Sequence, residues 1–207
     1  MSLTEISPWK TADDRLRERE AKREAVLAAA ARAFSERGFH NTALQDVARD
    51  LNVTKPTIYH YGESKEALLV ACYRRALDTL DQVTLDAPEA ATDSARERLR
   101  VLIVAYAEAI LSVYGRCLTR VPDNSVAPAI RAELRSMKRT VDDRIRTVLI
   151  DGEADGSLVA TDVKMTAFAI AGALNAAALW FEDDGPRTAR QIGAHYAALF
   201  VDALAPR

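Results

Sequence analysis

The sequence predicts an all-α protein, and three observations lead to this fold class. Long stretches rich in Ala, Leu, Arg and Glu favour helices, and most of the eight Gly and seven Pro lie between these stretches. Within them apolar residues recur at i, i+3, i+4 and i+7, which places them on one face of a helix. No Val- or Ile-rich segment alternates with polar residues between hairpin turns, so no pattern indicates a β-sheet.

Composition and charge restrict the class further. The 207 residues are 49% apolar and 28% charged, a balance typical of one or two core-forming domains and not of disordered or collagen-like chains. The net charge of −2 does not indicate a polyanion partner for the whole chain, although a local basic site remains open. Cys72 and Cys117 stand outside any C-x-x-C motif, which favours reduced core thiols over a disulfide, a zinc cluster or a redox site.

Targeting and membrane signals are weak in this sequence. No uninterrupted apolar run reaches the roughly 18 residues of a membrane span. Residues 1–20 are too acidic and too polar for a signal peptide. We therefore expect a cytoplasmic protein with no membrane partner and no cofactor.

Two helices are expected at the start of the chain. The first covers about residues 19–37, and Gly38 can end it in a left-handed conformation. The second is short, covers residues 42–51, and begins with a capping box formed by Thr42 and Gln45.

Two more helices complete the N-terminal half. The third covers residues 54–61, with Thr54 able to cap it and Pro56 in its first turn, where proline costs no intrahelical hydrogen bond. The fourth is longer, begins at Ser64 and fades at residues 86–88, where we place the domain boundary.

The rest of the chain contains four apolar stripes with helical spacing, over residues 99–110, 130–148, 162–181 and 186–204. Pro122 and Pro128 separate the first two. The last two are apolar on more than one face, so something must cover them. We favour a second subunit as the cover, and hence a homodimer, with burial inside the same chain as the alternative.

The second and third helices, joined by a short turn, match a helix-turn-helix, in which the second helix of the pair enters the DNA major groove. An ordinary helical hairpin has the same spacing. The third helix carries hydroxyl, ammonium and imidazole groups that can bond base edges or phosphates, from Thr54, Lys55, Thr57, Tyr59 and His60. A merely solvated polar face is the alternative.

Residues 23–69 contain a further pattern, made up of Ala29-Ala30, Phe34, Gly38-Phe39, Thr42, Val47-Ala48, Val53, the run Thr57 to Tyr61, and Ser64 to Leu68. With these positions the segment resembles the DNA-binding domain of the TetR family of transcriptional regulators. One position departs from the family pattern, because Gly62 stands where the family usually has Phe. Gly62 removes an apolar plug between the third and fourth helices.

This resemblance implies contacts with double-stranded DNA. Base contacts are expected from Lys55, Pro56 and Thr57. Phosphate contacts are expected from Thr42, Tyr59, His60 and Lys65, the last together with the N-terminus of its helix. Thr54 is either the helix cap or a further phosphate ligand. Residues 1–75 carry 13 Lys and Arg against 11 Asp and Glu, a small excess of the sign that DNA binding requires.

The resemblance also implies four regions with separate roles. They are an N-terminal extension (1–18), a three-helix helix-turn-helix domain (19–65), a connecting helix (66–86) and a C-terminal helical ligand-binding and dimerisation domain (87–207). The protein is then a ligand-responsive repressor, released from a palindromic operator by a small apolar or amphipathic effector. A transcriptional activator of the same fold is the alternative.

Candidate residues for the effector pocket lie on or near the apolar stripes of the C-terminal domain. They are Tyr106, Tyr114 and Met137, with Arg116 and Asn175 as the polar groups that orient the ligand. The arrangement of Gly172, Asn175 and Trp180 also resembles family members that sense acyl-CoA or other lipid-like compounds.

The last two helices resemble half of the four-helix dimer interface of many family members. Small residues allow helices to approach closely, and large aromatic residues anchor the contact. The expected interface residues are Gly172, Ala177, Ala178, Trp180, Phe181, Gly193, Tyr196, Ala197 and Phe200.

Two other patterns indicate metal binding, and neither is favoured. Residues 151–162 imitate a calcium loop but end in Asp162, shorter than the Glu that such loops use. The pair Asp142-Asp143 and the run Glu182-Asp183-Asp184 resemble paired carboxylates of a metal-dependent helical enzyme, yet no His is near them. We therefore expect neither a metal nor an enzyme.

Overall fold

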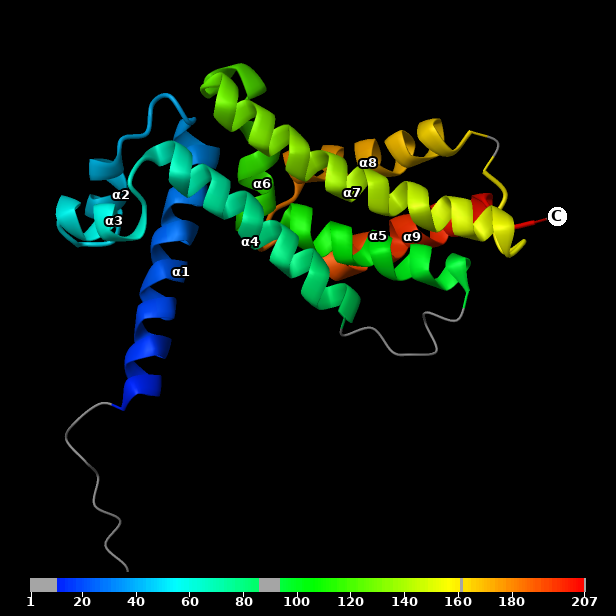
Figure 1. Ribbon diagram of the computed structural model, residues 1–207, viewed down its shortest axis with the longest axis horizontal. Coiled ribbons are helices and arrows are strands. Elements are labelled where there is room, and N and C mark those ends of the chain that lie inside the picture. Colours follow the sequence, from blue (N-terminus) through cyan, green and yellow to red (C-terminus); the bar gives the residue numbers. More distant parts are fainter. Residues whose placement is uncertain (1–10, 86–93, 161, 207) are drawn as a thin grey trace, which may run out of the picture.

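The computed structural model describes residues 11–85, 94–160 and 162–206, and these residues form helices and no strand (Figure 1). The helices are α1 (Ala12–Arg37), α2 (Leu44–Asp50), α3 (Lys55–Tyr61), α4 (Lys65–Leu85), α5 (Ala95–Leu111), α6 (Val113–Arg120), α7 (Pro128–Ala154), α8 (Val163–Trp180) and α9 (Ala189–Ala203). A short 3-10 turn, Asp123–Ser125, precedes α7. The all-α prediction is confirmed. Residues 1–10 lie outside the described residues. The expected domain boundary at residues 86–88 lies outside them too.

The molecule is elongated, with α1, α2 and α3 gathered at one end and α4 running from them into the bundle of α5 to α9 (Figure 1). The N-terminal half of α1 projects away from this body, and Val26 is its first buried residue. The helix begins seven residues earlier than we expected. Thr11 and Asp14 form a reciprocal capping box there, a start signal that apolar periodicity does not reveal.

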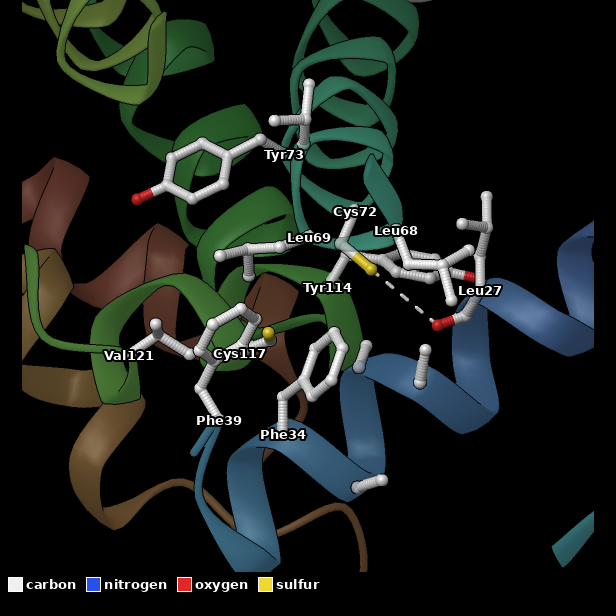
Figure 2. Close-up of a cluster of buried hydrophobic side chains, with 14 of the residues drawn as sticks. Leu27, Phe34, Phe39, Leu68, Leu69, Cys72, Tyr73, Tyr114, Cys117 and Val121 are labelled. Atoms are coloured by element: carbon white, nitrogen blue, oxygen red, sulfur yellow. Dashed lines mark hydrogen bonds between the residues drawn. The ribbon is translucent and has the colours of Figure 1, made fainter. Parts of the chain in front are cut away.

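The core of the N-terminal end includes residues from the C-terminal half of the chain. Phe34 and Phe39 meet edge to face with their ring centroids 5.1 Å apart, and Tyr114 and Cys117 of α6 close the same cluster (Figure 2). The predicted burial of both thiols is confirmed. Burial raises the pKa of the Cys72 thiol to about 12.

Helix α6 was not expected from the sequence. It follows α5 directly at an angle of 76°, and the Ser112 hydroxyl joins the two by donating to the Ala109 carbonyl (2.7 Å) and accepting from the Gly115 N–H (3.1 Å). A Cβ atom on Gly115 would lie 2.2 Å from the Ala109 carbonyl oxygen. Only glycine permits this close approach of backbone to backbone.

Helix α8 is long and apolar enough to cross a membrane by length and composition, and 28% of it is buried inside this chain. Its sequence is interrupted by Lys164, Thr166 and Asn175. Core helices of soluble proteins meet the same criterion, so the property indicates an apolar helix with an uncovered face.

The departure at Gly62 has a structural explanation. Gly62 is the residue after α3, and a Cβ atom there would lie 2.4 to 2.6 Å from side-chain carbons of the buried Leu68. Leu68 therefore fills the space that a larger residue at position 62 would occupy.

We predict that Gly62→Ala lowers the free energy of unfolding by about 1–3 kcal/mol, because the core around Leu68 is already packed. Leu68→Ala alone should cost about 2–5 kcal/mol through the cavity it leaves. The double variant should lose less than the sum, since each change relieves the other. Urea unfolding of the four proteins measures this coupling, and strict additivity would contradict the assigned contact.

Candidate functional site

Helix α3 presents a polar face to solvent and an apolar face to the core. Ile58 is fully buried, whereas Lys55, Pro56, Tyr59 and His60 are exposed. The Lys55 ammonium lies 5.5 Å from the centroid of the Tyr59 ring. A cation and an aromatic hydroxyl thus lie one turn apart on the exposed face of a helix whose opposite face packs on the core through Ile58.

The turn between α2 and α3 fixes where this face begins. Asn52 adopts a left-handed conformation (φ 53°), which lets the chain reverse within a few residues. Thr54 stands at the N-cap position without making a side-chain cap bond, and its hydroxyl lies 2.9 Å from that of the half-buried Thr57. Of the two roles open for Thr54, the structure therefore does not support the side-chain cap.

The prediction for Thr42 is wrong. Its side chain is 2% exposed, and its hydroxyl donates to the carbonyls of Ala33 (3.1 Å) and Gly38 (2.9 Å), so it is not available to a phosphate. The capping box with Gln45 is also wrong. Helix α2 begins two residues later, and the Asp46 carboxylate accepts from the Ala43 N–H at 3.0 Å.

Lys65 is likewise engaged inside the chain. Its ammonium donates to the Phe39 carbonyl (2.9 Å), lies 3.4 Å from those of His40 and Thr42, and stands 4.6 Å from the Phe39 ring centroid. The expected phosphate contact is replaced by a structural one, because the loop between α1 and α2 passes over the start of α4. Lys65 therefore holds this loop in place.

An ion pair joins α2 to the end of α1. Arg37 forms an ion pair with Asp50, and this hydrogen bond holds the pKa of Asp50 below its usual range. The pKa of Asp46 is also lowered, first by its bond with the Ala43 backbone.

Because the folded-state pKa of Asp50 lies below its unfolded value, its contribution to stability is present above the unfolded pKa and is lost as pH falls through the folded one. We therefore predict that Asp50→Asn lowers Tm by more at pH 7 than at pH 3. Calorimetry at both pH values measures this. Asp184→Asn, at an exposed position, is the control, and an equal Tm difference at the two pH values would contradict the pairing.

A cavity of about 840 Å³ lies within the helical bundle, with walls from α4, α5, α6, α7 and α8. Three of the five predicted pocket residues, Tyr106, Met137 and Asn175, line it. The Tyr106 hydroxyl donates to the Asn175 side-chain oxygen at 2.9 Å. Burial raises the pKa of Tyr106 to about 12, so the hydroxyl keeps its proton.

One wall of the cavity was missed from the sequence. Charged side chains of α7 line it at helical spacing, namely Lys138, Arg139, Asp142, Asp143 and Arg146. Asp142 and Arg146 pair at 2.6 Å. The signal was a charged stripe at i, i+1, i+4, i+5 and i+8, which shares one face of a helix.

The predictions for Tyr114 and Arg116 are wrong. Both lie on α6, which borders the cavity through Leu118 and Thr119, but the side chains of Tyr114 and Arg116 do not line it. Tyr114 faces α1, and Arg116 pairs with Asp183 at 2.6 Å while its guanidinium lies 5.4 Å from the Phe181 ring centroid.

The predicted dimer residues divide into two groups. Buried inside the chain are Ala177, Ala178, Phe181, Gly193 and Ala197, which therefore cannot meet a partner in this conformation. Gly193 packs on α5, where an added Cβ would lie 2.8 Å from that of Ala107. Tyr196 and Phe200 are half-buried and stacked, with centroids 6.4 Å apart, whereas Gly172 and Trp180 are exposed.

A second set of residues forms an exposed, largely apolar stripe along α8. Its members are Met165, Phe168, Ala169, Gly172, Ala176, Leu179 and Trp180. Their spacing places them on one face of α8, next to the face that buries Ala177 and Ala178 inside the chain.

The metal-like patterns are used in ordinary structural contacts. Asp183 binds Arg116, Asp151 binds Arg98 at 2.9 Å, and the Asp155 carboxylate accepts from the Ala95 N–H at 3.0 Å. In the part of the chain that the structure describes, which omits residue 161 of the calcium-like loop, no group of three or more His, Cys, Asp or Glu could hold a metal ion.

An all-α chain with a helix-turn-helix at one end and a cavity inside the helical bundle at the other has the architecture of a ligand-responsive DNA-binding transcriptional regulator. Residues 26–72 match the family model of bacterial regulatory proteins, tetR family, and residues 92–204 match the tetracyclin repressor-like C-terminal domain. The chain belongs to the TetR family. Members of this family are DNA-binding regulators and not enzymes, so Asp142-Asp143 and the run Glu182 to Asp184 are not a catalytic carboxylate set.

Three relatives illustrate the range of similarity. The HTH-type transcriptional regulator RutR of Escherichia coli K12 is 44% identical over 69 residues, which is 33% of this chain and only 32% of RutR. The activator FasR of Mycolicibacterium smegmatis is 27% identical over 81% of this chain and 76% of its own length. The repressor KstR2 of the same organism is 26% identical over 89% and 91%.

The solved structure of AibR in complex with isovaleryl coenzyme A and operator DNA has a similar fold. Its TM-score is 0.70 at 23% identity, covering 86% of this chain and 97% of AibR. At this identity the likeness extends to the fold alone.

Proposed function

We propose that this protein is a homodimeric transcriptional repressor of the bacterial cytoplasm that a small amphipathic effector releases from operator DNA. The observation that carries the proposal is the course of α4. This helix follows α3 along the chain and lines the cavity through its middle, from Tyr73 to Leu80, so one rigid element connects the DNA-facing end to the effector site. FasR is an activator, and activation by the same contacts is the second candidate.

In this proposal α3 enters the major groove. Lys55, Pro56 and Thr57 face the bases, whereas Tyr59 and His60 bind phosphates and Thr54 adds a polar contact. Thr42 and Lys65 take no part, since both are engaged inside the chain. Two subunits place their α3 helices in successive major grooves, roughly 34–36 Å apart.

The proposed effector class is an acyl-CoA thioester or another lipid-like compound. Apolar residues of α4 and α8, including Leu77, Leu80 and Ala171, supply a wall for an acyl chain. The Tyr106–Asn175 pair supplies polar atoms on the same cavity, and Lys138 and Arg139 on α7 suit an anionic group. AibR, a protein of the same fold, was solved with isovaleryl coenzyme A.

The proposed release is a shift in populations. The effector binds better to the conformation whose α3 spacing does not fit the operator, and it can shift the equilibrium only by this difference in affinity.

Selection of bound duplexes from random DNA by the purified protein tests this function. An enriched inverted repeat is the expected result, and a series of acyl-CoA thioesters of increasing chain length should then release the labelled duplex. If the folded dimer enriches no sequence, the proposal fails.

We predict that Lys55→Ala weakens binding and relaxes base preference at one position, because a base contact contributes about 1–3 kcal/mol of discrimination. Tyr59→Ala should weaken binding to all duplexes alike, since phosphates carry no sequence information. Fluorescence anisotropy on the selected operator and its single-base variants measures both effects. Lys164→Ala on α8 is the matched control, and wild-type profiles for both α3 variants would contradict the assignment.

Filling the cavity should abolish the response and leave DNA binding intact. We predict that Ala171→Trp binds the operator with near wild-type Kd but is no longer released by the acyl-CoA that releases the wild type, because the indole occupies the ligand's volume. Ala129→Trp, at an exposed position of α7, is the control and should still respond. A normal response of Ala171→Trp would place the effector elsewhere.

The exposed stripe of α8 is the proposed dimer surface. Gly172→Arg should give folded monomers, because the new side chain points into open space on this chain but into the partner helix in a dimer. Ala177→Arg should instead unfold the chain, since that position is fully buried. Light scattering and circular dichroism separate the two outcomes. Ala129→Arg is the control, and a dimeric Gly172→Arg protein would move the interface to another face.

A further inference from the structure

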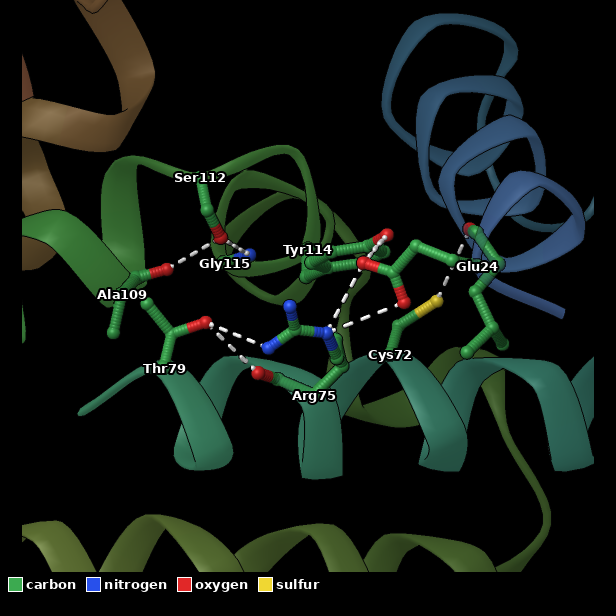
Figure 3. Close-up of polar contacts among 9 residues, drawn as sticks. Glu24, Cys72, Arg75, Thr79, Ala109, Ser112, Tyr114 and Gly115 are labelled. Atoms are coloured by element: carbon green, nitrogen blue, oxygen red, sulfur yellow. Dashed lines mark hydrogen bonds and ion pairs between the residues drawn. The ribbon is translucent and has the colours of Figure 1, made fainter. Parts of the chain in front are cut away.

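Glu24 of α1 is bound by side chains of two other helices, α4 and α6 (Figure 3). The Arg75 Nε on α4 donates to both carboxylate oxygens, at 3.1 and 3.2 Å. The Tyr114 hydroxyl on α6 donates to one of them at 2.8 Å. One carboxylate of the DNA-binding end thus joins α1, α4 and α6.

The partners of Glu24 are themselves held in place. The Arg75 guanidinium lies 5.8 Å from the centroid of the Tyr114 ring and donates to the Thr79 hydroxyl at 3.2 Å. Tyr114 is buried, and burial together with the hydrogen bond to Glu24 raises its pKa, so its hydroxyl stays a proton donor. The geometry is therefore that of an ordered joint and not of mobile surface charges.

Both partner helices also form walls of the cavity. On α4, Ala76 and Leu80 line the cavity, each one position after Arg75 and Thr79. On α6, Leu118 lines it one turn after Tyr114. A ligand that moves α4 relative to α6 must therefore change at least one of the two bonds to Glu24.

The two bonds differ in strength. Arg75 and Glu24 are 40% and 44% exposed, and an exposed ion pair contributes little. Tyr114 is only 6% exposed and its bond to Glu24 is partly buried, so losing the acceptor would leave a poorly solvated hydroxyl without this partner, which costs more. The bond from Tyr114 is hence the more important half of the joint.

We propose that Glu24 is a positioning residue for DNA binding. Its carboxylate, held by Arg75 and Tyr114, sets the angle between the helix-turn-helix and the effector domain, and occupancy of the cavity acts on DNA through this joint. This inference rests on the proposed function. It adds which atoms carry the signal between the two ends.

Three variants and one control test the joint. Tyr114→Phe removes only the hydroxyl, Glu24→Ala removes the acceptor, and Glu24→Gln is the conservative variant that keeps an acceptor for Tyr114. Glu133→Gln is the matched control, because Glu133 lies on α7 and pairs with Arg74 of the same α4, so this ion pair does not involve α1.

The first readout is tolerance of half-site spacing. The wild type should discriminate between the selected operator and operators lengthened or shortened by one or two base pairs. Glu24→Ala and Tyr114→Phe should lower this discrimination about tenfold, the effect of losing one bond to a charged group. Glu24→Gln should restore most of it. A merely structural role would weaken all spacings equally and would overturn the proposal.

The second readout needs no DNA. Hydrogen exchange of the amides around Glu24 and in α6 should rise in Glu24→Ala and Tyr114→Phe, with α5 unchanged and Glu133→Gln like the wild type. Exchange that stays at control levels would overturn the joint even if operator binding is established. If the wild type selects no operator while exchange changes locally, the proposed function fails and the role in DNA positioning fails with it.

Discussion

The packing of α6 against α1 and α4 is the contact on which the rest of the structure depends. This helix of eight residues leaves α5 at 76°, which the missing side chain of Gly115 permits, and carries Tyr114 and Cys117 into the core behind the helix-turn-helix. Without this turn, the α1–α4 unit would have an uncovered apolar face, and the cavity would lose its α6 wall. The DNA-facing helices and the effector cavity thus both depend on the packing of α6.

Elements with explicit end signals were predictable from the sequence. Pro56 and Ser64 marked the beginnings of α3 and α4 to within one or two residues, because such end signals are local, whereas α8 and α9 were expected from their apolar spacing. The start of α1 was not predictable from apolar spacing, since its first three turns bury nothing and are sustained by a capping box and ion pairs. Helix α6 escaped because so short a helix gives little periodic signal.

The site was predicted where a side chain's role depends on its own helix and not where it depends on distant packing. Tyr106, Met137 and Asn175 line the cavity because each lies on the face of its own helix that borders it. Ala-rich α8 has no strongly polar face to set its rotation, so the buried and exposed stripes were confused by one position. Thr42 and Lys65 are residue types that commonly bind DNA, but here both bind backbone carbonyls at the end of α1 and in the α1–α2 loop.

The shared core has a consequence for the modularity of this regulator. Because Tyr114 and Cys117 help to close the apolar cluster around Phe34, the DNA-binding unit does not end at α4 in physical terms. A chimaera that joins these first four helices to the sensor of another regulator would inherit a foreign α6 against its own α1. Such a chimaera keeps its response only if the α6 side chains that pack on α1 are transferred too. The unit to transfer is therefore α1 to α4 together with the face of α6 that carries Tyr114 and Cys117.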